Sequence, residues 1–144
     1  MDQVIQLQCG AIVTPLKRIL NPKGDVYHGL KATDDTFFGF GEAYFSTVYP
    51  GVTKGWKRHE RMTLNLVVPV GEIDFHLRSD GEATTDCIRL GETNYARLTV
   101  PPGLWMAFTG VGESLNLLLN VASIEHDPSE AVNVPLESFP LGRG

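Results

Sequence analysis

The stretch "MTLNLVVPVGEIDFHLR", residues 62–78, decides the fold, because hydrophobic residues occupy every second position on both sides of Gly71. Successive strand residues point to opposite faces of a sheet, so a period of two is typical of a β-strand with one buried face. Pro69 stands next to the turn, as expected at the end of a strand. We therefore predict two strands joined by a tight turn, with one apolar face made by Leu64, Leu66, Val68, Ile73, Phe75 and Leu77.

The rest of the chain consists of similarly short segments. Fifteen glycines and nine prolines divide the 144 residues into pieces rich in Val, Ile, Leu, Phe and Thr. Many short strands separated by turn residues are typical of an all-β sandwich or barrel. We expect a single domain over residues 1–144, with at most a short helical turn within "PSEAVNVPLESF", residues 128–139.

Composition and charge exclude several classes of protein. A net charge of −5 argues against general nucleic-acid binding, which needs a basic face. No run of apolar residues is long enough to cross a membrane. The two cysteines, Cys9 and Cys87, do not require an oxidising compartment, and the first ten residues do not form a signal peptide. We expect a cytoplasmic protein.

A basic cluster stands out against this acidic background in "GVTKGWKRHERM", residues 51–62. It is either a solvated strand edge, where lysine also blocks strand pairing, or the cationic mouth of a site for a small anion. If the segment is a strand, Lys57 and His59 point to one face while Lys54 and Trp56 point to the other. The cluster comprises Lys54, Lys57, Arg58, His59 and Arg61.

Polar residues at alternating strand positions are candidates for lining the lumen of a barrel. The alternative is that the same face of the sheet is simply exposed to water. Trp105, after a "PPG" turn, and Tyr44 have rings that could stack on a base or sugar. The polar candidates are Asn65, Asp74, His76, Asn116 and Asn120.

The order of short motifs from about residue 19 to residue 136 resembles the dTDP-4-dehydrorhamnose 3,5-epimerase family. The motifs are "KGD", "GVTKGWKRH", "VVPVGEIDFHLR", "LTVPPGLWMAF" and "LLLNVASIEHDPSE". The resemblance implies a cupin-like jelly roll that acts on a nucleotide-linked 4-keto sugar, and it implies a homodimer joined through edge strands. The apolar segment 4–13 is a candidate for such an exchange between subunits.

The resemblance also places the family's functional positions on this chain. The phosphate-binding arginine falls on Lys54, the catalytic base on Lys57, and the glutamine two residues later on His59. The acid tyrosine near the end of the last long strand is absent, since that region reads "LLLN", residues 117–120. Further substrate-binding positions of the family fall on Lys23, His28, Glu42 and Tyr44.

Lys57 and His59 would lie about 7 Å apart along one strand face. Two neighbouring cations suppress each other's protonation, and partial burial adds to this effect, so either group becomes a candidate base near neutral pH. A proton beside a ketone can be removed when a nearby cation stabilises the enolate oxygen. Return of the proton to the opposite face gives an epimer, whereas return to another carbon gives a ketoisomer.

We therefore expect an isomerase or epimerase of a nucleotide-linked 4-keto-6-deoxy sugar, in deoxysugar or surface polysaccharide biosynthesis. Lys57 and His59 are the catalytic candidates, and neither cofactor nor metal is expected. One alternative is a non-catalytic cupin that binds a sugar nucleotide or a related anion. Another is an isomerase of an unrelated small carboxylate or sugar phosphate. The expected substrate-binding residues are Lys23, His28, Glu42, Tyr44, Lys54, Asn65, His76, Trp105 and Asn120.

Overall fold

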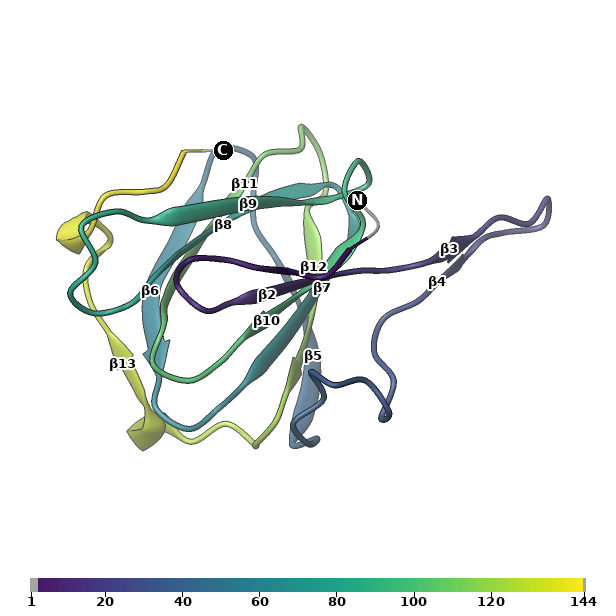
Figure 1. Ribbon diagram of the computed structural model, residues 1–144. Helices are drawn as coiled ribbons and strands as arrows, with labels where there is room; N and C mark the ends of the chain where they lie inside the picture. Colours follow the sequence, from purple (N-terminus) through teal and green to yellow (C-terminus); the bar gives the residue numbers. More distant parts are fainter. Residues whose placement is uncertain (1–2, 144) are drawn as a thin grey trace.

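The computed structural model describes residues 3–143, which fold into a sandwich of two antiparallel sheets (Figure 1). The six-stranded sheet has the order β1 (Ile5–Gln6), β2 (Ile12–Pro15), β10 (Ala96–Val100), β7 (Leu64–Val70), β12 (Leu117–Ala122) and β5 (Glu42–Thr47). The five-stranded sheet has the order β13 (Ala131–Asn133), β6 (Thr53–His59), β11 (Trp105–Gly110), β8 (Glu72–Arg78) and β9 (Asp86–Gly91). The predicted all-β class is confirmed.

The helical content of the described chain is small. Within residues 3–143 it consists of two 3₁₀ turns, η1 (Pro128–Glu130) and η2 (Leu136–Ser138), which lie where the sequence predicts a helical turn. Asp127 caps the first turn, since its carboxylate accepts a hydrogen bond from the backbone N–H of Ser129 at 3.0 Å. Neither turn has the length or apolar character needed to span a bilayer.

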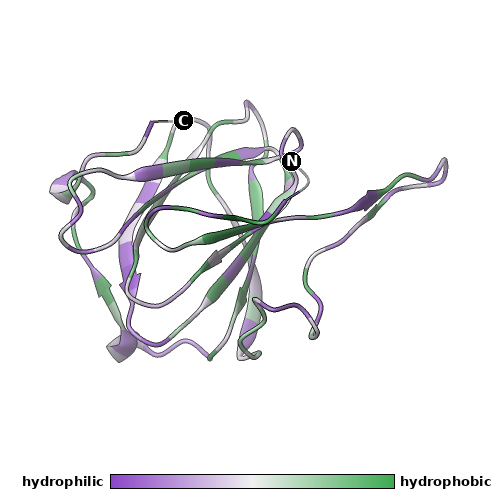
Figure 2. Cartoon of the chain, viewed as in Figure 1, coloured by the Kyte–Doolittle hydropathy of each residue, from purple (hydrophilic) through white to green (hydrophobic). Residues whose placement is uncertain are grey.

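The apolar face predicted around Gly71 is confirmed as part of the core. Its six hydrophobic residues on β7 and β8 are all buried between the two sheets, together with residues of β2, β9 and β10. Figure 2 shows the corresponding alternation of hydrophobic and hydrophilic residues along the strands. Each such side chain contributes roughly 1.5–3 kcal/mol to folding through removal of apolar surface from water.

A second, smaller cluster lies on the outer face of the five-stranded sheet. Trp56 and Trp105 pack there against Phe139, so the C-terminal segment covers this face. The indole N–H of Trp56 donates to the backbone carbonyl of Leu136 at 3.0 Å. Covering both faces of β6 and β11 fixes which of their side chains point into the sandwich.

Two hairpins lie at the periphery of the sandwich. β1 pairs with β2, and β2 pairs with β10 of the same chain, so the segment 4–13 is used in the chain's own sheet. The second hairpin, β3 (Arg18–Ile19) with β4 (Val26–Tyr27), projects away from the sandwich (Figure 1). Its exposed apolar side chains are Ile19, Leu20, Val26 and Tyr27.

Candidate active site

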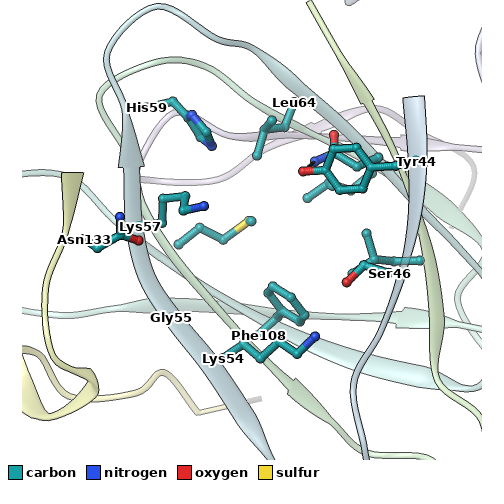
Figure 3. Close-up of a pocket in the computed structure, with 13 residues that line it drawn as sticks. Tyr44, Ser46, Lys54, Gly55, Lys57, His59, Leu64, Phe108 and Asn133 are labelled. Atoms are coloured by element: carbon teal, nitrogen blue, oxygen red, sulfur yellow. Dashed lines mark hydrogen bonds between the residues drawn. The ribbon is translucent and has the colours of Figure 1, made fainter. Parts of the chain in front are cut away.

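A cavity of about 270 Å³ opens between the two sheets, at the side where β5 and β6 face each other (Figure 3). Within residues 3–143, the hydrophobic core packs the interior beside this cavity. The cavity is lined by Tyr44, Ser46, Lys54, Gly55, Lys57, His59, Leu64, Leu66, Met106, Phe108, Leu118, Asn120 and Asn133.

Lys57 and His59 both line the cavity from β6, as their spacing predicts. The expectation that Lys54 points to the opposite face is wrong, because Lys54 also lines the cavity. The register between β6 and β11 shifts at this point: Lys57 is opposite Met106, whereas Lys54, three residues away, is opposite Phe108. This irregularity restores Lys54 to the inner face.

Gly55 permits this local geometry. Its backbone has φ of +150°, and a Cβ at this position would lie 2.4 Å from the Cβ and 2.7 Å from the Cα of Ala107. No side chain other than hydrogen fits so close an approach of β6 to β11. Gly55, which lies between the two lysines, therefore allows the local strand geometry in which both lysine side chains point into the cavity.

The basic cluster divides into two groups. Arg58 lies on the outer face, pairs with Asp80 at 2.6 Å and stacks over Trp105 at 4.7 Å from its ring centroid. Arg61 pairs with Asp127 at 3.0 Å on the surface. The arginines are thus paired surface charges, while the two lysines and His59 face the cavity.

His59 is paired with Glu130, a carboxylate that reasoning from the sequence did not identify. The Nδ1 atom of His59 lies within hydrogen-bonding distance of Glu130 Oε1. The other carboxylate oxygen accepts hydrogen bonds from the backbone N–H groups of Glu60 and Arg61, both at 3.1 Å, and of Met62 at 3.3 Å. Glu130 is only 3% exposed, so these donors replace its water shell.

The ionisation of Glu130 fixes the tautomer of His59. Burial raises the pKa of Glu130, but the hydrogen bonds from His59 and from the backbone of Arg61 and Met62 outweigh it, so the net pKa lies below its usual 4.5. An ionised carboxylate only accepts hydrogen bonds, so Nδ1 of His59 must carry the proton. In neutral His59, Nε2 then holds a free lone pair.

Lys57 projects from β6 into the cavity. Within residues 3–143 its ammonium group makes no hydrogen bond and no ion pair, and Figure 3 shows it directed into the cavity below His59. Lys54 is more constrained, because its Nζ donates to the backbone carbonyl of Thr47 at 2.6 Å and lies 5.9 Å from the Phe108 ring centroid.

The opposite wall of the cavity is uncharged. Tyr44 and Ser46 project from β5, and Asn120 projects from the neighbouring strand β12. The side-chain N–H of Asn120 donates to the hydroxyl of Tyr44 at 2.9 Å. Tyr44 and Asn120 are candidates that the sequence identified, whereas Ser46 was missed.

The structure places Asn65 away from the cavity. Leu64 and Leu66 line the cavity from β7, so Asn65 points to the other face of that sheet. There its carboxamide oxygen accepts from the guanidinium of Arg97 at 3.2 Å and from the hydroxyl of Thr99 at 2.6 Å. Its side-chain N–H donates to the backbone carbonyl of Thr36, and this hydrogen bond holds the segment around Thr36 against the sheet.

His76 and Trp105 also lie outside the cavity, on the outer face of the five-stranded sheet. The Nδ1 atom of His76 accepts from the backbone N–H of Gly142 at 3.1 Å, and its Nε2 lies 2.9 Å from the hydroxyl of Thr109. Burial lowers the pKa of His76 below its usual 6.5, although the charge of Asp74 acts in the opposite direction. Trp105 donates to Asp80 at 2.9 Å.

The remaining upstream candidates do not converge on the cavity within one chain. Lys23 is exposed at the tip of the β3–β4 hairpin. His28 lies at the base of that hairpin, beside a separate hollow of about 170 Å³ that Arg97 also lines. Glu42 begins β5, where its carboxylate accepts from the backbone N–H of His126 at 3.1 Å.

A metal centre is not indicated by the described residues. In residues 3–143, no group of three or more His, Cys, Asp or Glu side chains is arranged to hold a metal ion. The polar groups of the cavity are the His59–Glu130 pair and Lys57 on one wall, and Tyr44 with Asn120 on the other.

The chain is similar to two curated proteins over part of its length. No family model matches the chain. A probable low-salt glycan biosynthesis epimerase of Haloferax volcanii is 31% identical over 91 residues, or 59% of this chain and 58% of that protein. A spore coat polysaccharide biosynthesis protein of Bacillus subtilis is 28% identical over 96 residues, or 63% of this chain and 64% of that protein. The chain thus matches less than two thirds of the length of either curated relative.

The likeness to a solved structure covers nearly the whole chain. The crystal structure of a dTDP sugar isomerase from Desulfovibrio desulfuricans G20 has a TM-score of 0.83 and 35% identity, over 90% of this chain and 86% of that one. The cupin-like jelly roll expected from the sequence is thereby confirmed. The chain belongs to the family of dTDP-sugar epimerases and isomerases, the dTDP-4-dehydrorhamnose 3,5-epimerase family that its sequence resembles.

Proposed function

We propose that the protein isomerises a nucleotide-linked 4-keto-6-deoxy sugar by removing a proton from the carbon next to the ketone. The observation that carries the proposal is the His59–Glu130 pair, which presents an imidazole to a cavity that also contains a free ammonium group. The names of the relatives, which include a dTDP sugar isomerase and a glycan biosynthesis epimerase, support the substrate class.

His59 acts as the base in this reaction. Glu130 holds the proton on Nδ1, so Nε2 is free to take the proton from carbon, and the carboxylate stabilises the imidazolium that results. Lys57 supplies the cation for the negative charge that develops on the ketone oxygen. This proposal assigns the role of base to His59 and the role of stabilising cation to Lys57, which the sequence alone does not distinguish.

The shape and charge of the cavity suit such a substrate. Part of its inner surface is apolar, where Leu64, Leu66, Met106 and Phe108 exclude water from the reacting carbon. A cavity of about 270 Å³ accommodates the sugar and leaves the nucleotide at the mouth, where Lys54 meets the phosphate charge. The reaction moves protons without net oxidation, so it requires no redox cofactor.

The proposal includes a homodimer and a cytoplasmic location. β5 is an edge strand of the six-stranded sheet, and it carries the exposed side chain of Phe45. The apolar β3–β4 hairpin is a second surface that another copy would cover, in which case Lys23 would reach a neighbouring subunit. Sedimentation measurements should give twice the 15.8 kDa mass of one chain. The free thiols of Cys9 and Cys87 fit a reducing compartment.

Hydrogen exchange tests the function directly. The protein is incubated in deuterated water with dTDP-4-keto-6-deoxyglucose, and NMR follows deuterium at the carbons next to the ketone. We expect exchange well above the enzyme-free rate, with the His126→Asn variant as a control because His126 is exposed on the surface. Binding without exchange, across dTDP-, UDP- and GDP-linked keto sugars, would replace this function by that of a non-catalytic sugar-nucleotide-binding cupin.

A further inference from the structure

Asn120 is a buried polar residue in an apolar row of the cavity wall. The row consists of the side chains of β12 that point into the sandwich, and its other members, Leu118 and Ala122, belong to the core. Asn120 is 5% exposed and lines the cavity. A hydrophobic residue at this position would be buried at a lower cost, so the asparagine indicates a role other than folding.

The carboxamide of Asn120 is held at one end only. Asn120 is paired with Tyr44 in the register of β12 and β5, and its side-chain N–H donates to the Tyr44 hydroxyl at 2.9 Å. This hydrogen bond orients the amide, so that its nitrogen faces Tyr44 and its oxygen Oδ1 does not. In residues 3–143, Oδ1 is a buried acceptor without a hydrogen-bond partner.

The position of this unpaired acceptor on the cavity wall points to a ligand. Within the described part of the chain, Oε2 of Glu72 is also buried and unpaired, but Glu72 does not line the cavity. The other oxygen of Glu72 accepts from the backbone N–H and the hydroxyl of Thr93 at 3.1 and 3.0 Å, so that carboxylate still has partners. Folded proteins retain few unpaired buried acceptors, and a bound ligand that donates to Asn120 Oδ1 accounts for this one.

Few groups of the proposed substrate can donate this hydrogen bond. In a nucleotide-linked 4-keto-6-deoxy sugar, C1 carries the nucleotide, C6 is a methyl group, and the ketone and the ring oxygen only accept. The hydroxyl groups at C2 and C3 are the donors. Figure 3 shows His59 and Lys57 on the wall that faces Tyr44, the partner of Asn120, so a sugar between the walls can meet the base and the acceptor together.

We propose that Asn120 is a specificity-determining residue: its Oδ1 accepts a hydrogen bond from the C2 or C3 hydroxyl of the sugar, and the protein therefore selects hydroxylated 4-keto sugars over their deoxy analogues. This inference rests on the proposed function and deepens it. A deoxy analogue leaves Oδ1 unpaired in the complex, whereas the hydroxylated sugar supplies its donor. The same hydrogen bond fixes the rotation of the ring relative to His59.

Deoxy substrates test the proposal on the wild-type protein. We compare dTDP-4-keto-6-deoxyglucose with its 2-deoxy and 3-deoxy analogues, and NMR in deuterated water gives kcat/KM for deuterium uptake next to the ketone. We expect kcat/KM to fall by about 100-fold for the analogue that lacks the hydroxyl bound by Asn120. A fall with the 2-deoxy analogue assigns the hydrogen bond to the C2 hydroxyl, and a fall with the 3-deoxy analogue assigns it to the C3 hydroxyl. Equal values for all three substrates would overturn the proposal.

The Asn120→Leu variant separates this hydrogen bond from the intrinsic reactivity of the analogues. Leucine has a similar size and no acceptor, so kcat/KM of the variant should agree within about threefold among the three substrates. Asn94→Leu makes the same change in the turn between β9 and β10, outside the cavity, and should discriminate as the wild type does. A melting temperature near that of the wild type shows that each variant is folded. Discrimination of wild-type strength in Asn120→Leu would overturn the proposal.

A binding measurement tests the same contact without turnover. We expect His59→Asn to lack proton removal, so calorimetry on this variant gives the Kd of each of the three keto sugars. A Kd that is about tenfold or more higher for one deoxy analogue supports the contact with Asn120, and three equal Kd values contradict it. Absence of deuterium uptake from dTDP-4-keto-6-deoxyglucose with the wild type would instead contradict the proposed function, so the two failures are distinguishable.

Discussion

Glu130 and His59 lie 71 residues apart in the sequence, yet they form a hydrogen-bonded pair on the wall of the cavity. The pair is assembled because β13, which follows Glu130 directly, is antiparallel to β6 and pairs Ala131 with His59. A buried carboxylate with three backbone donors is held rigidly. It therefore orients the imidazole before any substrate arrives.

Replacing Glu130 by Gln tests the positioning role. The amide oxygen still accepts the backbone hydrogen bonds, but its N–H₂ group cannot accept the proton on Nδ1 of His59, so the wrong tautomer is favoured. We expect kcat to fall by about 100-fold or more with little change in KM, measured by steady-state epimerisation. Glu137→Gln, on an exposed carboxylate, is the control. A fall in melting temperature without a fall in kcat would assign Glu130 a structural role alone.

Lys57 and Lys54 should affect different kinetic constants. Lys57→Met keeps a flexible, unbranched and slightly shorter side chain but removes the charge beside the enolate, so we expect kcat to fall by about 10²–10³-fold. Lys54→Met removes a charge at the mouth, so we expect a rise in KM for the nucleotide sugar with a smaller change in kcat. Steady-state kinetics on both variants measures kcat and KM separately. A raised KM with an unchanged kcat in Lys57→Met would show that Lys57 only binds the substrate.

The acid stability of the fold should depend on His76. Its pKa in the folded protein is lower than the usual 6.5, so the unfolded chain binds more protons as pH falls through that value. Stability is therefore complete above about pH 6.5 and declines below it. We expect His76→Gln to flatten this decline between pH 7.5 and pH 5, as followed by urea unfolding. An unchanged slope would mean that another group causes the acid sensitivity.

Arg97 should matter for stability and not for catalysis. It is 2% exposed and donates to Gly29 and Thr36 at 2.8 Å and to Asn65 at 3.2 Å. Removal of this donor leaves its buried acceptors unpaired, which costs about 1–3 kcal/mol for each acceptor. Arg97→Met should lower the unfolding free energy by at least the cost of one acceptor.

The control for Arg97 is an exposed ion pair. Arg89 pairs with Asp74 at 2.8 Å, and its side chain is 51% exposed, so Arg89→Met should cost no more than about 1 kcal/mol. Urea unfolding of the two variants compares them. Equal costs, or a loss of kcat in a folded Arg97→Met protein, would contradict the structural role of Arg97.

The sequence predicts the sandwich well because alternation is a local property. Leu64, Leu66 and Leu77 reveal the buried face of their strands within a few residues, and the structure confirms them. Alternation does not say which face of a sheet meets the cavity. Asn65 and His76 were expected in the lumen because they are polar, but the lumen is lined by the apolar row of β7.

Two parts of the site depend on information that no strand pattern carries. Lys54 faces inward because β6 departs from regular pairing next to Ala107, a neighbour that is distant in sequence. Glu130 lies in a 3₁₀ turn at the end of the motif "LLLNVASIEHDPSE", outside any strand, and only the pairing of β13 brings it to His59. Long-range pairing decided both outcomes, so neither was visible in the segment "GVTKGWKRH" alone.

The central claim is that His59, oriented by Glu130, removes the proton from the sugar. Deuterium uptake into dTDP-4-keto-6-deoxyglucose, followed by NMR with the His59→Asn variant, tests it most directly. We predict that uptake falls to the enzyme-free rate while the variant keeps its melting temperature and still binds dTDP. Uptake at the wild-type rate in a folded His59→Asn protein would contradict the account and leave Lys57 as the base.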